Sequence, residues 1–149
     1  MTWNFEHSIT TKASKKALWA LYSNVESWPI WDQGIENISL DGEFKEGAKG
    51  KIEPDGQGIM SYRIVFADPD KGFSDETIMD DIGAYLKFVH TFTDLPDGKI
   101  QLTHHVSISC PGKEEFEEKL GTGISFGIPG TMESLARMAI FLDKFCKFR

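Results

Sequence analysis

The sequence predicts an α+β domain in which a curved antiparallel sheet wraps around a long C-terminal helix. Two observations lead to this prediction. Residues 131–148 carry apolar side chains over an arc about 240° wide, well beyond the roughly 100° stripe of a helix that lies on a surface. The residues before position 111 form mostly short segments in which polar and apolar side chains alternate, as in strands. A helix that is apolar on most sides needs cover, and a curved sheet provides it.

The composition indicates one globular domain spanning residues 1–149, because 40% of the side chains are hydrophobic. A net charge of −7 and a pI near 5.1 argue against a nucleic-acid partner, which requires clustered cations. Membrane insertion is not expected, because no apolar run approaches the roughly eighteen residues that a span needs. The N-terminus lacks the apolar core of a signal peptide, so a cytoplasmic location is expected. Cys110 and Cys146 are interpreted as reduced thiols in apolar surroundings.

The first third of the chain predicts a strand followed by two short helices. The strand covers residues 3–11, and Ser14 is expected to cap a helix whose apolar face includes Tyr22. A second short turn reaches residue 28, and Pro29 ends it. The indoles of Trp28 and Trp31 are then either a plug for one end of the sheet or part of a ligand site.

Six further strands are expected between residues 35 and 110, separated by turns that contain glycine or proline. Their predicted ranges are 35–40, 50–53, 59–67, 73–79, 84–94 and 99–110. In the strand 59–67 the alternation places one set of side chains inward, namely Met60, Tyr62, Ile64 and Phe66. The alternation does not decide the inward face of residues 73–79.

The hairpin between the two longest strands predicts a specific pair of histidines. A three-residue loop at 96–98, with Gly98 in the left-handed region, sets Leu95 opposite Lys99. Paired residue numbers then sum to 194, so His90 and His104 are cross-strand neighbours, about 5 Å apart at Cβ on the concave face. We expect at least one of them to be neutral at pH 7, because two like charges at that distance repel each other.

The C-terminal region is predicted as two helical segments. Residues 114–126 have apolar side chains at i, i+4 and i+8, but Gly121, Gly123 and Gly127 weaken a helix there. The segment 127–130 is expected to bend or break it at Pro129. The glycines indicate either close packing on the sheet or a thin backbone above a cavity.

The order of these elements resembles the START-like (SRPBCC) superfamily, in particular its polyketide cyclase/dehydrase-like branch. The segments that carry the resemblance are 17–19 with 25–32, 44–50, and 127–129 with 132–135. The resemblance implies a helix-grip fold, a seven-stranded antiparallel sheet around the last helix with a hydrophobic pocket between them. It also implies functions as different as lipid or hormone carriers, aromatase/cyclases and regulators of chaperones, with no shared catalytic signature.

We therefore expect a carrier or sensor of a small hydrophobic ligand such as a lipid, a polyketide or an aromatic metabolite, acting as a monomer or weak homodimer. The expected ligand-binding residues are Trp31, Tyr62, Phe66, Phe88, His90, Phe92, His104 and Met132. One alternative is a cyclase or dehydrase that uses His90 or His104 as an acid or base. Another is an adaptor that regulates a protein. No cofactor is expected, and two histidines without a third ligand fall short of a metal site.

Overall fold

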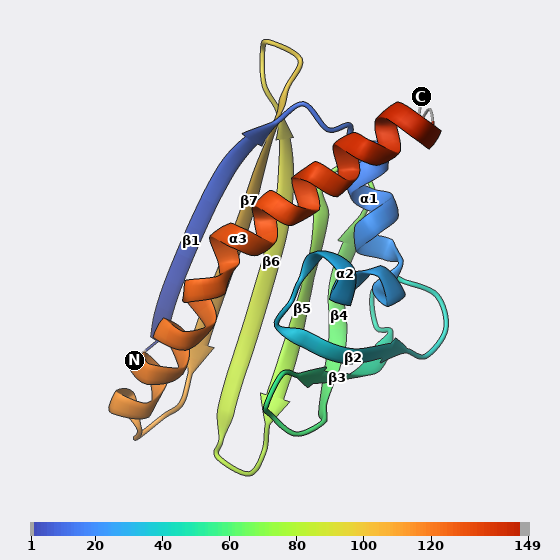
Figure 1. The fold of residues 1–149 in the computed structure, drawn as a ribbon. Helices are drawn as coiled ribbons and strands as arrows, with labels where there is room; N and C mark the ends of the chain where they lie inside the picture. The colour runs from blue at the N-terminus through green and yellow to red at the C-terminus, as the bar shows by residue number, and fades with distance from the viewer. Residues whose placement is uncertain (1, 147–149) are drawn as a thin grey trace.

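The computed structural model describes residues 2–146, and in it a long helix lies across one face of a curved antiparallel sheet (Figure 1). The strands are β1 (Thr2–Thr11), β2 (Ile35–Leu40), β3 (Lys49–Pro54), β4 (Met60–Asp68), β5 (Gly72–Met79), β6 (Ala84–Asp94) and β7 (Ile100–Ser109). The helices are α1 (Lys15–Ser23), α2 (Trp28–Trp31) and α3 (Glu114–Cys146), with a 3-10 turn η1 (Val25–Ser27) before α2. The predicted end of the last helix at Phe148 lies outside the described residues.

The strands form one seven-stranded sheet in the order β1-β7-β6-β5-β4-β3-β2, and all neighbours are antiparallel. Consecutive strands are paired from β2 to β7, so hairpins build most of the sheet. The strand β1 pairs with the other edge of β7. In the sequence, α1 and α2 therefore come between β1 and β2, which lie at opposite edges of the sheet. The predicted fold class is confirmed.

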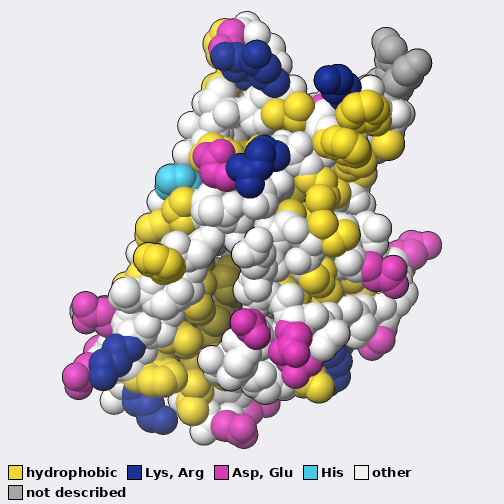
Figure 2. Space-filling model, viewed as in Figure 1, with side chains coloured by type: hydrophobic (Ala, Val, Ile, Leu, Met, Phe, Trp, Pro, Cys, Tyr) yellow, Lys and Arg dark blue, Asp and Glu magenta, His cyan; other side chains and the backbone are white. Residues whose placement is uncertain are grey.

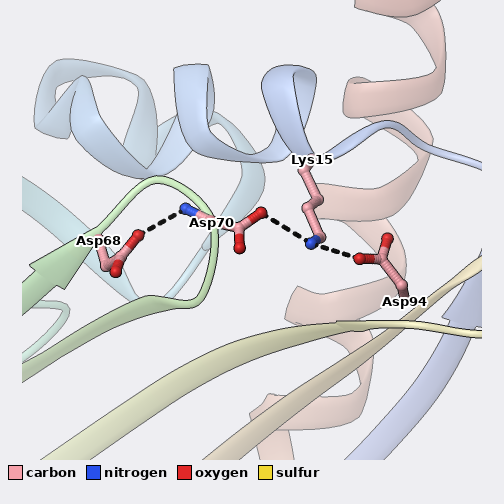
Figure 3. Close-up of polar contacts among 4 residues, drawn as sticks. All are labelled: Lys15, Asp68, Asp70 and Asp94. Carbon is pink, nitrogen blue, oxygen red and sulfur yellow. Dashed lines mark hydrogen bonds and ion pairs between the residues drawn. The ribbon is translucent and has the colours of Figure 1, made fainter.

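Polar contacts fix the start of α1 to distant parts of the chain. The Ser14 hydroxyl caps the helix by accepting from the Ala17 N–H at 3.0 Å, as expected, and it also donates to the Asp143 carboxylate at 2.5 Å. Lys15 donates to Asp70 at 2.9 Å and to Asp94 at 2.6 Å, which ties α1 to the β4–β5 turn and to the end of β6 (Figure 3). These contacts hold α1 against one end of the sheet and against the C-terminal part of α3.

The helix α3 is continuous from Glu114 to Cys146, so the expected break at Pro129 is wrong. A proline in a helix interior costs about 3 kcal/mol. Packing on both sides of it outweighs this cost, because Gly121 lies against the Trp3 ring and Leu135 is fully buried in the core. The expectation that the sheet covers the whole apolar arc is also wrong, since Phe141 and Phe145 are exposed.

A register shift between Ile64 and Phe66 changes the facing of β4. Before the shift Tyr62 and Ile64 point inward and are buried, as predicted. After it Ala67 packs on the core, whereas Phe66 is 43% exposed, so its predicted inward orientation is wrong. A bulge turns all later side chains of a strand to the opposite face, and the alternation of residue types alone did not reveal it.

The buried side chains form two hydrophobic clusters. The larger one joins α1, α2 and the C-terminal half of α3 to the sheet, and includes Leu18, Trp28, Phe73 and Leu135. The smaller one joins β1, β6 and β7 to the N-terminal half of α3. Among the described helices none is apolar over the length that a bilayer crossing requires.

Both cysteines are free thiols in the described part of the chain. Cys110 is buried in the smaller cluster, as expected. Cys146 is exposed, so the expectation of apolar surroundings is wrong for this thiol.

Candidate ligand cavity

A cavity of about 890 Å³ lies between the sheet and α3. Side chains of both hydrophobic clusters line it, including Trp31 and Tyr62 of the larger cluster and Leu86 and Ile124 of the smaller one. It therefore lies where the two clusters meet, and Ile128 packs against both. In the space-filling view it appears as a hollow beside α3 with a hydrophobic interior and acidic side chains near its edge (Figure 2).

Five of the eight expected ligand-binding residues line this cavity: Trp31, Tyr62, Phe88, His90 and His104. The other three do not. Phe66 points to the opposite face of the sheet, and Phe92 and Met132 are buried in the larger cluster. Phe92 and Met132 do point into the space between the sheet and α3, but core side chains fill that part of the space.

The predicted pairing of His90 with His104 is confirmed, because β6 and β7 have the expected register. The imidazole centroids are 4.5 Å apart, and the two rings meet edge to face. The Leu95 N–H donates to the Lys99 carbonyl at 2.9 Å, and Gly98 has a φ of 84°. The three-residue loop thus sets the register of the cavity wall.

Two aromatic neighbours hold the histidines. The Tyr22 hydroxyl lies 2.7 Å from His104 Nε2, and the His90 ring stacks on Phe73 with centroids 4.1 Å apart. Tyr22 was assigned only to an apolar helix face from the sequence. A tyrosine on a buried face needs a partner for its hydroxyl, and that requirement was the signal that sequence reasoning missed.

Burial keeps both imidazoles neutral near pH 7. It lowers the pKa of His90 to about 3. It also lowers the pKa of His104 well below its ordinary value, with smaller contributions from His90 and from His7 on the neighbouring strand β1. These directions agree with the expectation from the predicted pairing. His90 Nδ1 is buried and has no hydrogen-bond partner among the described residues.

A carboxyl group that the sequence did not identify also lines the cavity. Asp75 lies on β5 between Ile64 of β4 and Phe88 of β6, and it is 6% exposed. Burial, and then the charge of neighbouring Glu76, raise the pKa of Asp75 to about 8. The facing of β5 was undecided from the sequence because its central side chains on both faces are buried.

The two indoles of α2 combine the two roles considered for them. Trp28 is 5% exposed and donates to the Tyr22 carbonyl at 2.9 Å, and Trp31 is 3% exposed and donates to the Ser27 hydroxyl at 3.2 Å. Both close one end of the sheet, and both line the cavity. Asp32, which follows them, also lines the cavity and accepts from the Gly34 N–H at 2.9 Å. Burial raises the pKa of this carboxyl.

The glycines of α3 divide between the two explanations offered for them. A Cβ on Gly121 would lie 2.3 Å from the Trp3 ring, so this glycine permits close packing. A Cβ on Gly123, Gly127 or Gly130 would meet nothing within 4 Å, and all three residues line the cavity. The helix is therefore thin where it passes over the cavity.

The charged side chains around the opening have both signs. Lys119 and Arg137 of α3 and Asp55 after β3 line the cavity and are exposed. Arg137 donates to the Ser134 hydroxyl at 3.3 Å. Within residues 2–146, no three histidine, cysteine or carboxylate side chains are grouped as a metal site.

Several solved structures have this architecture. The Zhui aromatase/cyclase from Streptomyces sp. R1128 matches with a TM-score of 0.79 at 13% identity, over 95% of this chain and 96% of that chain. Norcoclaurine synthase from Thalictrum flavum matches at 0.74 and 14% identity, over 94% and 87%. Ara h 8.0201 matches at 0.73 and 14% identity, over 94% and 99%.

The chain has the helix-grip fold of these proteins, which confirms at the level of fold the resemblance predicted from the sequence. No protein-family model matches the chain, and no curated protein matches its sequence. Sequence identities this low establish the fold alone, so the function has to be argued from the site.

Proposed function

We propose that this protein binds a small, largely apolar ligand in the cavity between the sheet and α3, and acts as its carrier or sensor. The cavity itself is the observation that carries this proposal. Its volume of about 890 Å³ lies in the range of small-molecule sites, and most of the surface of its wall is apolar. Folding would ordinarily fill such a space with side chains, because an unfilled apolar cavity costs stability.

The enzyme alternative, with His90 or His104 removing a proton from an enolisable ligand, is supported less well. A general base works best when its pKa is near the working pH. Burial lowers the pKa of both imidazoles, to about 3 for His90, and His104 already contacts the Tyr22 hydroxyl. Neutral imidazoles of this kind suit orientation of a ligand group better than proton abstraction.

Native mass spectrometry of freshly purified protein tests the proposal for whatever ligand the cell supplies. A mass above that of the chain, lost on denaturation, is the expected result. Binding of 1-pyrenemethanol, followed by its fluorescence, tests the cavity directly, since the probe is apolar, uncharged and small enough to enter. Saturable binding at micromolar concentration is expected.

Two neighbouring positions of α3 give matched variants. Gly127 lines the cavity and has open space beside it, whereas Phe126 does not line it and is 90% exposed. Gly127→Leu should weaken probe binding by about tenfold or more. The leucine side chain would occupy space that the probe needs, and forcing extra methylene groups into filled space costs about 1 to 3 kcal/mol. Phe126→Leu should leave binding unchanged. Equal binding by both variants would place the probe elsewhere, and no saturable binding by the unaltered protein would contradict the proposal.

A further inference from the structure

Two consecutive acids of β5 have opposite environments. Glu76 faces away from the cavity, accepts from Arg63 Nη2 at 2.5 Å and also accepts the Tyr85 hydroxyl. These partners lower the pKa of Glu76, with Tyr85 contributing most. Asp75 faces the cavity, and none of the side-chain hydrogen bonds of residues 2–146 involves its carboxyl. The chain thus pairs one acid with a cation and a hydroxyl, and directs the other into the cavity.

Stability does not explain an unpaired acid at this position. Burying a polar group without a hydrogen bond costs about 1 to 3 kcal/mol in proteins. Asp75 is 6% exposed and lies between Ile64 and Phe88, where an apolar residue would complete the wall. A buried polar group without a partner that points into a cavity is a group that a ligand can satisfy.

The interior around Asp75 offers no cation but several aromatic faces. The other titratable groups that line the cavity away from its exposed charges are Tyr62 on β4, His90 on β6, His104 and His105 on β7, and Asp32 after α2. Burial keeps His90 and His104 neutral. Burial, followed by the nearby Asp75, raises the pKa of the Tyr62 phenol, whose hydroxyl donates to the Ser39 carbonyl at 2.9 Å. The cations Lys119 and Arg137 are exposed and belong to the outer part of the cavity.

We propose that the ligand is an amine, whose ammonium group lies against Asp75 while its apolar body fills the cavity. This inference rests on the proposed ligand-binding function and specifies the class of ligand. The ammonium would pair with the Asp75 carboxylate, which has no cationic side chain as a partner among the described residues. The rings of Tyr62 and Phe88, which also line the cavity, would add cation–π contacts. A net charge of −7 also favours the approach of cations over that of anions.

Binding of an amine by this site is coupled to release of a proton. With its pKa near 8, Asp75 holds a proton at pH 7 while the cavity is empty. A bound ammonium stabilises the carboxylate, so the proton of Asp75 goes to the solvent and the ammonium keeps its own. A neutral ligand of the same shape leaves Asp75 protonated and releases none. The number of protons released therefore distinguishes the two kinds of ligand.

The experiment compares 1-pyrenemethylamine with 1-pyrenemethanol, which differ only in the amine and the hydroxyl. Calorimetry in two buffers of different ionisation enthalpy should give close to one proton released per amine at about pH 7 and none per alcohol. Between about pH 6 and pH 7.5 the dissociation constant of the amine should fall by up to about tenfold per pH unit. That of the alcohol should stay constant.

Two carboxyl variants locate the effect. Asp75→Asn keeps the shape of the side chain, and it should remove both the proton release and the pH dependence while binding of the alcohol persists. Asp32→Asn changes the other partly buried carboxyl of the cavity and should keep both signals. Persisting alcohol binding also shows that each variant is folded.

The outcomes separate this inference from the function on which it rests. If both probes bind with equal affinity and without proton release, the cavity binds apolar ligands and the amine proposal is wrong. If Asp32→Asn alone removes the signals, the amine lies at the opening and the assignment to Asp75 is overturned. If neither probe binds, the proposed function itself fails.

Discussion

The two halves of α3 lie on the same face of the sheet but contact it differently. The C-terminal half packs three buried side chains into the filled core, and these are Met132, Leu135 and Ala139. The N-terminal half buries only Glu117 and Gly121, and three further glycines pass over the cavity with open space beside them. One helix thus supplies stability at one end and room for a ligand at the other. Substitutions in the filled core and at the glycines over the cavity should have effects of opposite sign.

The largest effect is expected from Leu135→Ala in the filled half. Leu135 is fully buried, and removing such a side chain from a core costs about 2 to 5 kcal/mol. Phe145→Ala should cost less than about 0.5 kcal/mol, because the ring is 62% exposed. Urea unfolding of both variants measures this difference. Equal losses would mean that the C-terminal half packs differently from the structure. Leu142 is only partly buried, so Leu142→Ala should cost less than Leu135→Ala.

Gly121→Ala tests a tight contact of the N-terminal half. The added methyl would approach the Trp3 ring to 2.3 Å, so the ring or the helix must shift. Overpacking of this kind typically costs about 1 to 3 kcal/mol, which outweighs the gain of up to about 1 kcal/mol from replacing glycine in a helix. A lower midpoint of urea unfolding is expected. A stabilised variant would show that the Trp3 ring can move aside and that α3 is not tightly packed against it.

The histidine pair lies at the border between the two regions, where Tyr22 of the filled core reaches the cavity wall. Both imidazoles have folded pKa values below the unfolded value of about 6.5, so the folded protein binds fewer protons and loses stability as the pH falls below that value. The raised pKa of Asp75 acts in the opposite direction between about pH 4 and pH 8.

His104→Gln removes one of these contributions. Between about pH 4.5 and pH 6 the free energy of unfolding of the unaltered protein should gain a contribution from His104 of about 1.4 kcal/mol per pH unit. The variant should lack this contribution. Urea unfolding across that range measures the difference. The pKa of His90 should remain low in the variant, because burial is its main cause. An NMR titration of His90 that moves to about 6.5 would instead make repulsion by His104 the cause.

The sequence predicted those features that short-range geometry determines. The alternation along β6 and β7 and the Gly98 turn were enough to pair His90 with His104. The Ser14 cap followed from local backbone chemistry in the same way. The features it missed depend on contacts between distant residues. The bulge that turns Phe66 outward, the facing of Asp75 and the continuity of α3 through Pro129 are all decided by packing partners far away in the chain.

The smallest effect, and the one of opposite sign, is expected from Gly127→Ala in the half that spans the cavity. A methyl group at this position meets nothing within 4 Å, so no contact opposes it. Alanine in a helix is favoured over glycine by up to about 1 kcal/mol, because glycine loses more backbone freedom on folding. The variant should therefore unfold at a slightly higher urea concentration.

Because Gly127 lines the cavity, the same methyl should weaken binding of 1-pyrenemethanol slightly, and less than Gly127→Leu does. A gain in stability together with a loss in binding would indicate that glycine is kept here to leave room for the ligand. A loss of stability would mean that this half of α3 is packed more tightly than the structure shows, and the contrast between the two halves would no longer hold.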